Sequence, residues 1–251
     1  MKTALLIITL SVLNFVSFGQ LTLSDLEQTI KKSKTDHIKA LIHVTGGQLF
    51  VTGGATELAL VKLTYSKDEW DPTISFAEDQ NVGKLTVMAK MKEEDNNIED
   101  NNICRIQLNS GLHYSLGVVL GAGLADADFS GMNVSKALFR LGVGSFKVNL
   151  SNTSVPLLKV EAGIGEALFD LSGGWKNDLS ATINAGIGQM HLVVPANVGV
   201  KVTVKGFLGS VETPGYRKVG KEYTNALYGK TKHNLEFDIT GAVGTVVVTE
   251  K

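Results

Sequence analysis

The chain has 251 residues, with 24 lysines and arginines against 25 aspartates and glutamates, which gives a net charge of −1. No basic excess is present to attract nucleic acid or anionic lipid, so we exclude nucleic acid as a partner. The single cysteine, Cys104, excludes an internal disulfide, and we interpret it as a small, partly buried residue rather than a nucleophile. An exported domain without disulfides must be stabilised by its core.

Residues 1–19 have the features of a secretory signal peptide. Lys2 gives a positive start, residues 4–16 are apolar, and Ser17 and Gly19 place small residues before Gln20. The apolar run is short for a membrane span, and an uncleaved N-terminal anchor is the alternative. We expect export to the periplasm or the cell exterior, with no transmembrane span after signal removal.

Residues 20–110 predict an N-terminal part with irregular strands. Residues 21–38 are an extended lead-in or a short helix, and glycine-led alternating runs follow from Gly47 and Gly83. Trp70-Asp71-Pro72 is expected to interrupt strand pairing. Residues 92–102 are highly polar and offer no apolar face, so they predict a loop.

Residues 111–251 contain a regular repeat. Its marker glycines are 21, 21, 23 and 21 residues apart: Gly123, Gly144, Gly165, Gly188 and Gly209. The first four follow another glycine by two positions, and each begins an alternating run such as Gly144 to Leu150, with Phe146, Val148 and Leu150 on one face. A fixed period with one short strand at a fixed phase predicts a solenoid.

We therefore predict an all-β, parallel β-solenoid with rungs of about 21 residues and two facing sheets. The Gly-x-Gly pairs belong at a corner that needs positive φ. They do not match a nucleotide-binding loop, which needs a third glycine that opens a helix. We expect Phe146, Phe169 and Leu192 in one column. We expect residues 213–234 to form an inserted loop and the rung at Gly244 to close the stack. The two parts, 20–110 and 111–251, are expected to form one continuous structure.

The glycine series resembles the toast-rack family of bacterial envelope proteins. It is also similar to the C-terminal domain of LiaF-type stress-response proteins and to GIN-type auto-transporter adhesin heads. The matching segments are 42–51, 121–123, 141–144, 162–165, 185–188, 192–200, 223–225 and 240–244. The resemblance implies an all-β solenoid outside the cytoplasm and brings no catalytic signature. LiaF-type proteins usually also carry membrane helices, which are not expected here.

One predicted outward column is a candidate catalytic face. It contains Asp126, Lys147, Leu168, His191 and Glu212. Glycoside hydrolysis needs two carboxylates roughly 5–10 Å apart, and Asp126 and Asp128 lie about 7 Å apart on one strand face. Alternating charges on an exposed sheet are an ordinary solubilising pattern, and His191 lies three rungs away. We expect no catalytic residues and no cofactor site.

The sequence also offers no clear metal motif. The five histidines lack ligand spacing: His37, His43, His113, His191 and His233. The acidic group of the 92–102 loop is better explained as solvated than as a calcium site: Glu93, Glu94, Asp95, Glu99 and Asp100. We expect no metal site, although folding can bring distant histidines together.

Two function classes follow from these features. The first is a non-catalytic, exported envelope module, adhesive or scaffolding, with an envelope protein or surface glycan as partner and a link to envelope stress response implied by the resemblance. The alternative is a carbohydrate-active enzyme on a β-helix. The first predicts no convergent acids, whereas the second predicts a groove that crosses several rungs with an acid facing a base.

Overall fold

The computed structural model describes residues 23–92 and 102–251. Within these residues every regular element is a β-strand, and hydrogen bonds join 15 strands in one sheet. The all-β class and the parallel stacking are confirmed, while two separate facing sheets are not confirmed by this pairing. The predicted signal peptide and residues 93–101 of the predicted polar loop lie outside the described residues. No helix in the described chain has the length and apolar character of a membrane span.

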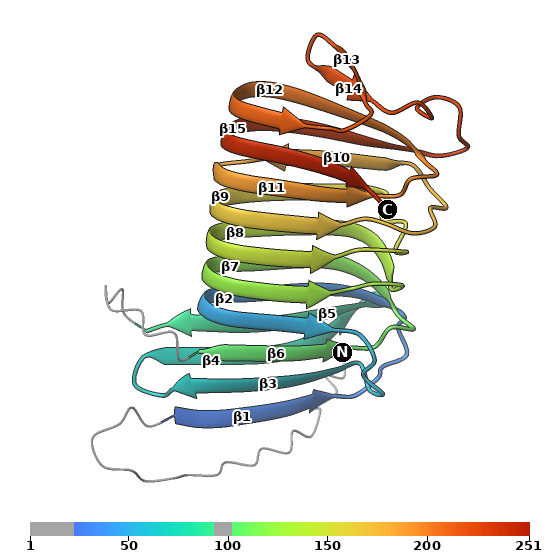
Figure 1. The fold of residues 1–251 in the computed structure, drawn as a ribbon. Coiled ribbons are helices and arrows are strands. Elements are labelled where there is room, and N and C mark those ends of the chain that lie inside the picture. The colour runs from blue at the N-terminus through green and yellow to red at the C-terminus, as the bar shows by residue number, and fades with distance from the viewer. Residues whose placement is uncertain (1–22, 93–101) are drawn as a thin grey trace.

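The strands follow the chain as labelled in Figure 1. Their bounds are β1 Leu23–Ile30, β2 His37–Thr52, β3 Ala59–Ser66, β4 Trp70–Asp79, β5 Val82–Met91, β6 Ile103–Leu108, β7 His113–Asp128, β8 Asn133–Asn149, β9 Leu157–Asp170, β10 Leu179–Asn184, β11 Ile187–Val194, β12 Gly199–Glu212, β13 Arg217–Val219, β14 Glu222–Thr224 and β15 Asn234–Glu250.

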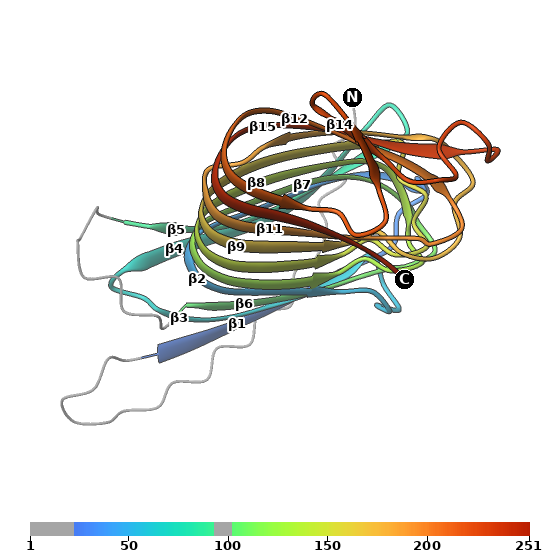
Figure 2. The same ribbon diagram turned by 45° about the horizontal axis from the view of Figure 1, so that its top comes forward.

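Long parallel strands form the centre of the molecule. β2, β7, β8 and β9 stack in chain order, and each bends sharply near its middle, so that its two halves run along opposite sides of the stack (Figures 1 and 2). The sequence predicted separate strands that start at the glycines. β7, β8 and β9 instead continue through the bend, and their glycines pair in register, Gly123 with Gly144 and Gly144 with Gly165. β10 and β11 are separate strands, and β11 begins at Ile187, next to Gly188.

The second glycine of each pair is required by two separate constraints. Gly144 has a φ of +143° and Gly165 a φ of +130°, which confirms the predicted positive φ. A Cβ on Gly165 would also lie 1.9 Å from the Gly144 carbonyl oxygen of the strand below. Glycine therefore allows both the backbone conformation and the close approach of neighbouring bends.

Alternation along the strands builds one continuous core between the two halves. Phe139, in the first half of β8, packs edge-on against Phe169, in the second half of β9, with ring centroids 5.5 Å apart. The predicted inward face is confirmed, since all its members are buried: Phe146, Val148, Leu150, Ala167, Phe169, Leu171, Met190, Leu192 and Val194.

The predicted column of Phe146, Phe169 and Leu192 is wrong by one inward position. Phe146 pairs with Ala167, while Phe169 pairs with Val148 and Leu192. Phe146 is the second residue after its marker glycine, whereas Phe169 and Leu192 are each the fourth. Strand register therefore places Phe146 two residues away from the other two.

The C-terminal strands do not stack in chain order. β15 lies between β10 and β11 on one side and β12 on the other, and Gly244 pairs with both Gly188 and Gly209. The expectation that the Gly244 rung ends the stack is wrong, because β12 is the outer strand. Its first half is covered by β14 at Lys201–Thr203, and β14 in turn pairs with β13.

The N-terminal end combines parallel and antiparallel strands. Residues 23–30 form strand β1, which pairs with β3, so the lead-in is a strand rather than a helix. β5 pairs with the first half of β2 and β6 pairs with its second half, both parallel. β4 then pairs antiparallel with β5, and β3 pairs antiparallel with β6. Pro72 lies within β4 and does not interrupt pairing, because β4 is an edge strand that pairs with β5 alone.

Candidate interaction surface

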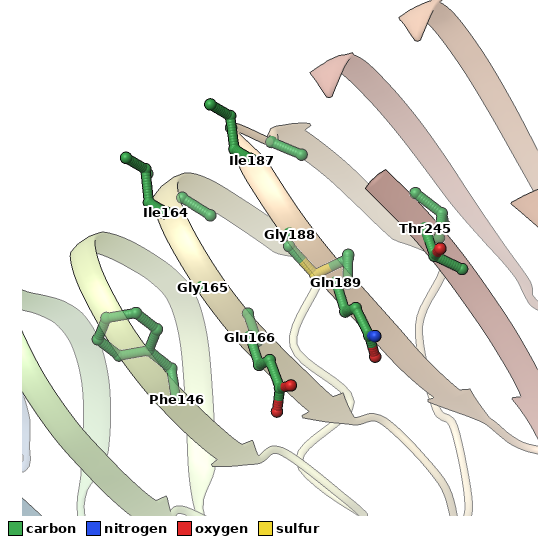
Figure 3. A pocket seen from close by; sticks show the side chains of 15 residues that line it. Phe146, Ile164, Gly165, Glu166, Ile187, Gly188, Gln189 and Thr245 are labelled. Carbon is green, nitrogen blue, oxygen red and sulfur yellow. The ribbon is translucent and has the colours of Figure 1, made fainter. Parts of the chain in front are cut away.

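A row of exposed aliphatic side chains follows the outside of the bend. We call it the corner ridge, and it contains Val143, Ile164, Ile187, Val243 and Leu208, with exposed fractions of 53, 51, 54, 48 and 72%. Strand register places them side by side in this order. Figure 3 shows Ile164 and Ile187 projecting away from the bend.

The glycines explain why the ridge is exposed. Val143 and Ile164 each stand between two glycines, so no side chain on the same strand shields them. With a strand spacing of about 4.8 Å, five residues make a straight apolar row about 19 Å long. Contiguous exposed apolar residues on a soluble domain are typical of an interaction surface.

The inside of the same bend does not offer room for a ligand. The cavity there is lined by Phe146, Ala167 and Met190 together with the glycine backbone (Figure 3), and its volume is about 20 Å³. That volume is close to the space for one water molecule. Only the outer side of the bend is therefore accessible for contact with another molecule.

The predicted outward column is confirmed in part. Asp126, Lys147, Leu168 and His191 pair in succession, but Val247 separates His191 from Glu212. Lys147 Nζ lies 3.4 Å from the Asp126 carboxylate in an exposed ion pair. His191 Nε2 is hydrogen bonded to Thr249 Oγ1 at 2.9 Å, three strands from Asp126. Histidine and aspartate therefore do not converge.

Asp128 has a structural role that the sequence reading missed. Its carboxylate accepts the Ser130 N–H at 2.9 Å, and Asn149 and Asp170 accept the N–H of Ser151 and Ser172 in the same way. Side chains of Asn and Asp commonly close turns by bonding the backbone two residues on. The pattern Asp/Asn-x-Ser recurs at the ends of β7, β8 and β9 and is the signal that identifies these turns.

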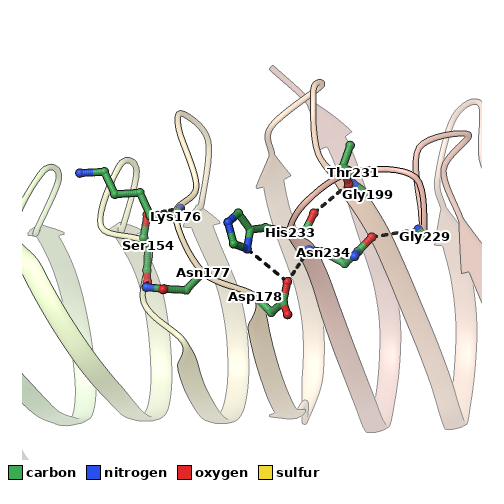
Figure 4. Close-up of polar contacts among 9 residues, drawn as sticks. All are labelled: Ser154, Lys176, Asn177, Asp178, Gly199, Gly229, Thr231, His233 and Asn234. Atoms are coloured by element: carbon green, nitrogen blue, oxygen red, sulfur yellow. Dashed lines mark hydrogen bonds and ion pairs between the residues drawn. The ribbon is translucent and has the colours of Figure 1, made fainter.

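A second pair of carboxylates borders a surface hollow of about 290 Å³ beside Pro156. Asp178 accepts the Asn234 N–H at 2.9 Å and lies 3.6 Å from His233, as Figure 4 shows. Glu236 accepts a hydrogen bond from the Tyr228 hydroxyl and lies 3.0 Å from Lys201. The hydrogen bond from Tyr228 and the contact with Lys201 hold the pKa of Glu236 below its ordinary value. A glycosidase general acid needs a raised pKa, and the pKa of Glu236 is shifted in the opposite direction.

Cys104 is fully buried, and its burial raises the pKa of the thiol to about 12. The thiol therefore stays protonated at neutral pH, where only a thiolate would act as a nucleophile. The sequence predicted a partly buried cysteine, whereas the structure buries it completely; a raised thiol pKa agrees with the expectation that it is not a nucleophile.

The fold brings two of the five histidines together and keeps the others apart. His37 and His113 face each other across β2 and β7, next to Asp36. His43 lies further along β2, His191 lies on β11 and His233 lies just before β15, all outside this group. Sequence spacing could not reveal the pair, because it depends on the parallel register of β2 and β7.

Comparison with known proteins gives the family and the fold. A family model described as the N-terminal domain of toast_rack, DUF2154, matches residues 19–157. A solved structure described as a "putative cell adhesion protein" from Clostridium sporogenes is 24% identical, with 92% of this chain and 100% of that chain covered and a TM-score of 0.70. No curated protein matches.

Another solved structure is a "putative adhesin" from Bacteroides fragilis, 12% identical, with 91% of this chain and 98% of that chain covered and a TM-score of 0.33. Since the family model spans more than half of the sequence, the resemblance inferred from the glycine series is confirmed, and the chain belongs to the family of the toast_rack N-terminal domain.

Proposed function

We propose that the protein is a non-catalytic, exported envelope module that adheres to another envelope protein through the corner ridge. The observation that carries this proposal is the ridge itself: five aliphatic side chains in register, each about half exposed or more. Burying such a row against a partner releases apolar surface from water, which is the main favourable term in protein association. The Clostridium sporogenes structure is described as a "putative cell adhesion protein", which is consistent with an adhesive role.

The chemistry of the ridge favours a protein partner over a glycan. Ridge side chains such as Ile164 and Ile187 carry no hydrogen-bonding groups and no aromatic ring. Sugar hydroxyls buried against them would lose their hydrogen bonds to water without replacement, at a cost in free energy. A partner that presents its own aliphatic stripe would meet no such cost.

The alternative of a carbohydrate-active enzyme receives less support from the geometry. Asp126 and His191 are separated by strands, Asp128 closes a turn, and the Glu236 pKa is lowered rather than raised. Catalytic acids and bases need convergence and tuned pKa values. We therefore propose that the protein has no enzymatic activity and that a surface glycan is not its ligand.

We further propose that residues 20–251 act as one continuous unit after removal of a signal peptide at residues 1–19. Support comes from the single sheet that includes strands of both the 20–110 and 111–251 parts. In the finer form of this proposal, the unit is a β-solenoid with 213–234 as an inserted loop, it resides in the periplasm or outside the cell, and it is linked to the envelope stress response.

Binding of the purified protein to envelope preparations of the source organism tests the adhesive role. We expect saturable binding that is lost after the preparation is digested with protease and kept after glycosidase treatment. Ile164→Asp with Ile187→Asp should weaken binding at least about tenfold, because each charge must be desolvated in the interface. The matched control is Glu166→Ala with Gln189→Ala, two residues further along the same strands, which should bind like the wild type.

Two results would contradict the proposal. Binding that survives protease but not glycosidase would identify a glycan partner. Cleavage of peptidoglycan or another polysaccharide, abolished by Asp126→Asn, would establish the enzymatic alternative.

A further inference from the structure

Asp36, His37 and His113 gather where β2 and β7 begin side by side. His37 pairs with His113 in the strand register, and their ring centroids are 5.1 Å apart. The Asp36 carboxylate lies between them, with Oδ1 3.7 Å from His37 Nε2 and Oδ2 3.8 Å from His113 Nδ1. One ligand atom of each residue lies within 4.8 Å of the other two.

We propose that these three residues bind a zinc ion. Zinc is held by imidazole nitrogen and carboxylate oxygen at about 2.0–2.2 Å, so ligand atoms in a tetrahedral site lie about 3.4 Å apart. The two Asp36 oxygens each lie within a few tenths of an ångström of that value from one histidine, and one ligand atom from each of the three residues lies within 4.8 Å of the others, so the ligands must close in on the ion when it binds. Small side-chain rotations bring three ligands into place and leave a fourth position open to water.

The backbone that carries the three ligands is already fixed by hydrogen bonds. The His113 N–H donates to the Asp36 carbonyl oxygen at 2.7 Å, which ties the loop before β2 to the start of β7. On the other side, the Thr35 hydroxyl donates to the Asn81 carbonyl oxygen. Binding therefore needs no rearrangement of the chain, and only three side chains lose rotational freedom on binding.

The donor set selects zinc over the hard cations. Calcium and magnesium prefer oxygen ligands, and a site with two imidazoles and one carboxylate offers them little. Lys39 lies two residues beyond His37 on the same strand face, about 7 Å away, and its charge opposes a cation. The next cation along that row, Lys84, is paired with Asp79 at 2.9 Å. Asp36 supplies the compensating negative charge.

Zinc titration of the protein without a polyhistidine tag tests the site. Calorimetry should give one zinc per chain, and zinc should raise the melting temperature because it binds the folded state. His37→Ala and His113→Ala should each weaken binding at least about tenfold, and Asp36→Asn should weaken it as well. The controls are His191→Ala and His233→Ala, and the latter removes another histidine that lies next to an aspartate.

The proposal fails if zinc binding is absent or is equally strong in the His37→Ala/His113→Ala double variant. It also fails if calcium displaces zinc at equal concentration, because that result would indicate an oxygen-ligand site elsewhere. If a variant does not fold, NMR of the wild-type imidazoles decides: zinc should shift the His37 and His113 signals, and shifts at other histidines instead would overturn the assignment.

Discussion

From β7 to β9, neighbours in space are also neighbours in the chain, whereas beyond β11 the next strand in the stack is β15, with β12 outside it. Both regions nevertheless align their marker glycines, since Gly188, Gly244 and Gly209 pair in turn as Gly123, Gly144 and Gly165 do. The comparison teaches that the register of a rung is fixed by its glycine bend and not by its place in the sequence.

The two regions differ in how they bend. In the middle, Gly163 has no positive φ, and a Cβ on it would lie 2.3 Å from the Gly142 carbonyl oxygen. In β12 the corresponding position, one step before the ridge residue, is taken by Phe207, and the preceding Gly206 has a φ of +63°. A Cβ on Gly206 would find its nearest atom 3.9 Å away. At these positions, close backbone approach requires glycine in the first region and backbone conformation favours it in the second, while the marker glycines of both regions meet both constraints.

The largest contrast is expected from substitution of these glycines. Gly165→Val should lower the free energy of unfolding by about 5 kcal/mol. A strained φ and an overpacked backbone contact contribute about 1–3 kcal/mol each, and the β-branched side chain of valine adds to the overpacking. Gly206→Asn should cost less than about 1 kcal/mol, because asparagine tolerates the left-handed conformation. Urea unfolding checks both. A loss for Gly206→Asn as large as that for Gly165→Val would contradict the difference described between these two positions.

Truncation of the core should have the next largest effect. Phe169 is fully buried and contacts Phe139, so Phe169→Ala should lower the free energy of unfolding by roughly 3–5 kcal/mol. The matched change in the C-terminal region is Leu208→Ala, which removes a side chain that is 72% exposed and should change stability by less than about 0.5 kcal/mol. Thermal unfolding that showed a small loss for Phe169→Ala would contradict the described core.

Acid should loosen residues 213–233 through loss of the Glu236 contact. The hydrogen bond from Tyr228 lowers the pKa of Glu236, so its stabilising effect is present above its ordinary pKa and is lost as the pH falls below about 4.5. Hydrogen exchange of residues 213–233 should lose protection in that range. Glu236→Gln should remove most of the pH dependence, and an unchanged profile in this variant would exclude Glu236 as the cause.

The smallest effect is expected from the charged column in the middle of the stack. Asp126→Asn removes an exposed ion pair with Lys147, and such pairs are worth about 0–1 kcal/mol. We expect a change within about 0.5 kcal/mol and no loss of adhesion. A loss of binding without a loss of stability would move the interaction surface from the corner ridge to this face.

Local sequence determined much of this architecture. The alternation around Phe169 and the recurring glycines define the buried face, the parallel class and the positive φ at Gly144 and Gly165. These features depend on residues within one rung, so they can be read without knowledge of the fold. The predicted position of Phe146 beside Phe169 is wrong within the same rungs, because stacking follows the number of residues after the marker glycine and not the type of side chain.

Long-range features could not be read in the same way. The place of β15 inside β12 depends on which edges are free when the chain closes, and no local pattern near Gly244 encodes it. The pair His37 and His113 depends on the register between β2 and β7. The exposure of Ile164 and Ile187 was also missed, since an apolar residue between two glycines reads as interior until the direction of the bend is known.

The inserted position of β15 sets an order for folding. β12 precedes β15 in the chain but reaches the stack only through it, so β12 cannot dock before residues 234–250 are in place. In the proposed export from the N-terminus, the strands from β2 to β9 can meanwhile add rung by rung, in keeping with the tendency of N-terminal segments to fold first. A chain that ends before residue 234 would therefore carry a stacked middle and a tethered β12 that lacks its β15 partner.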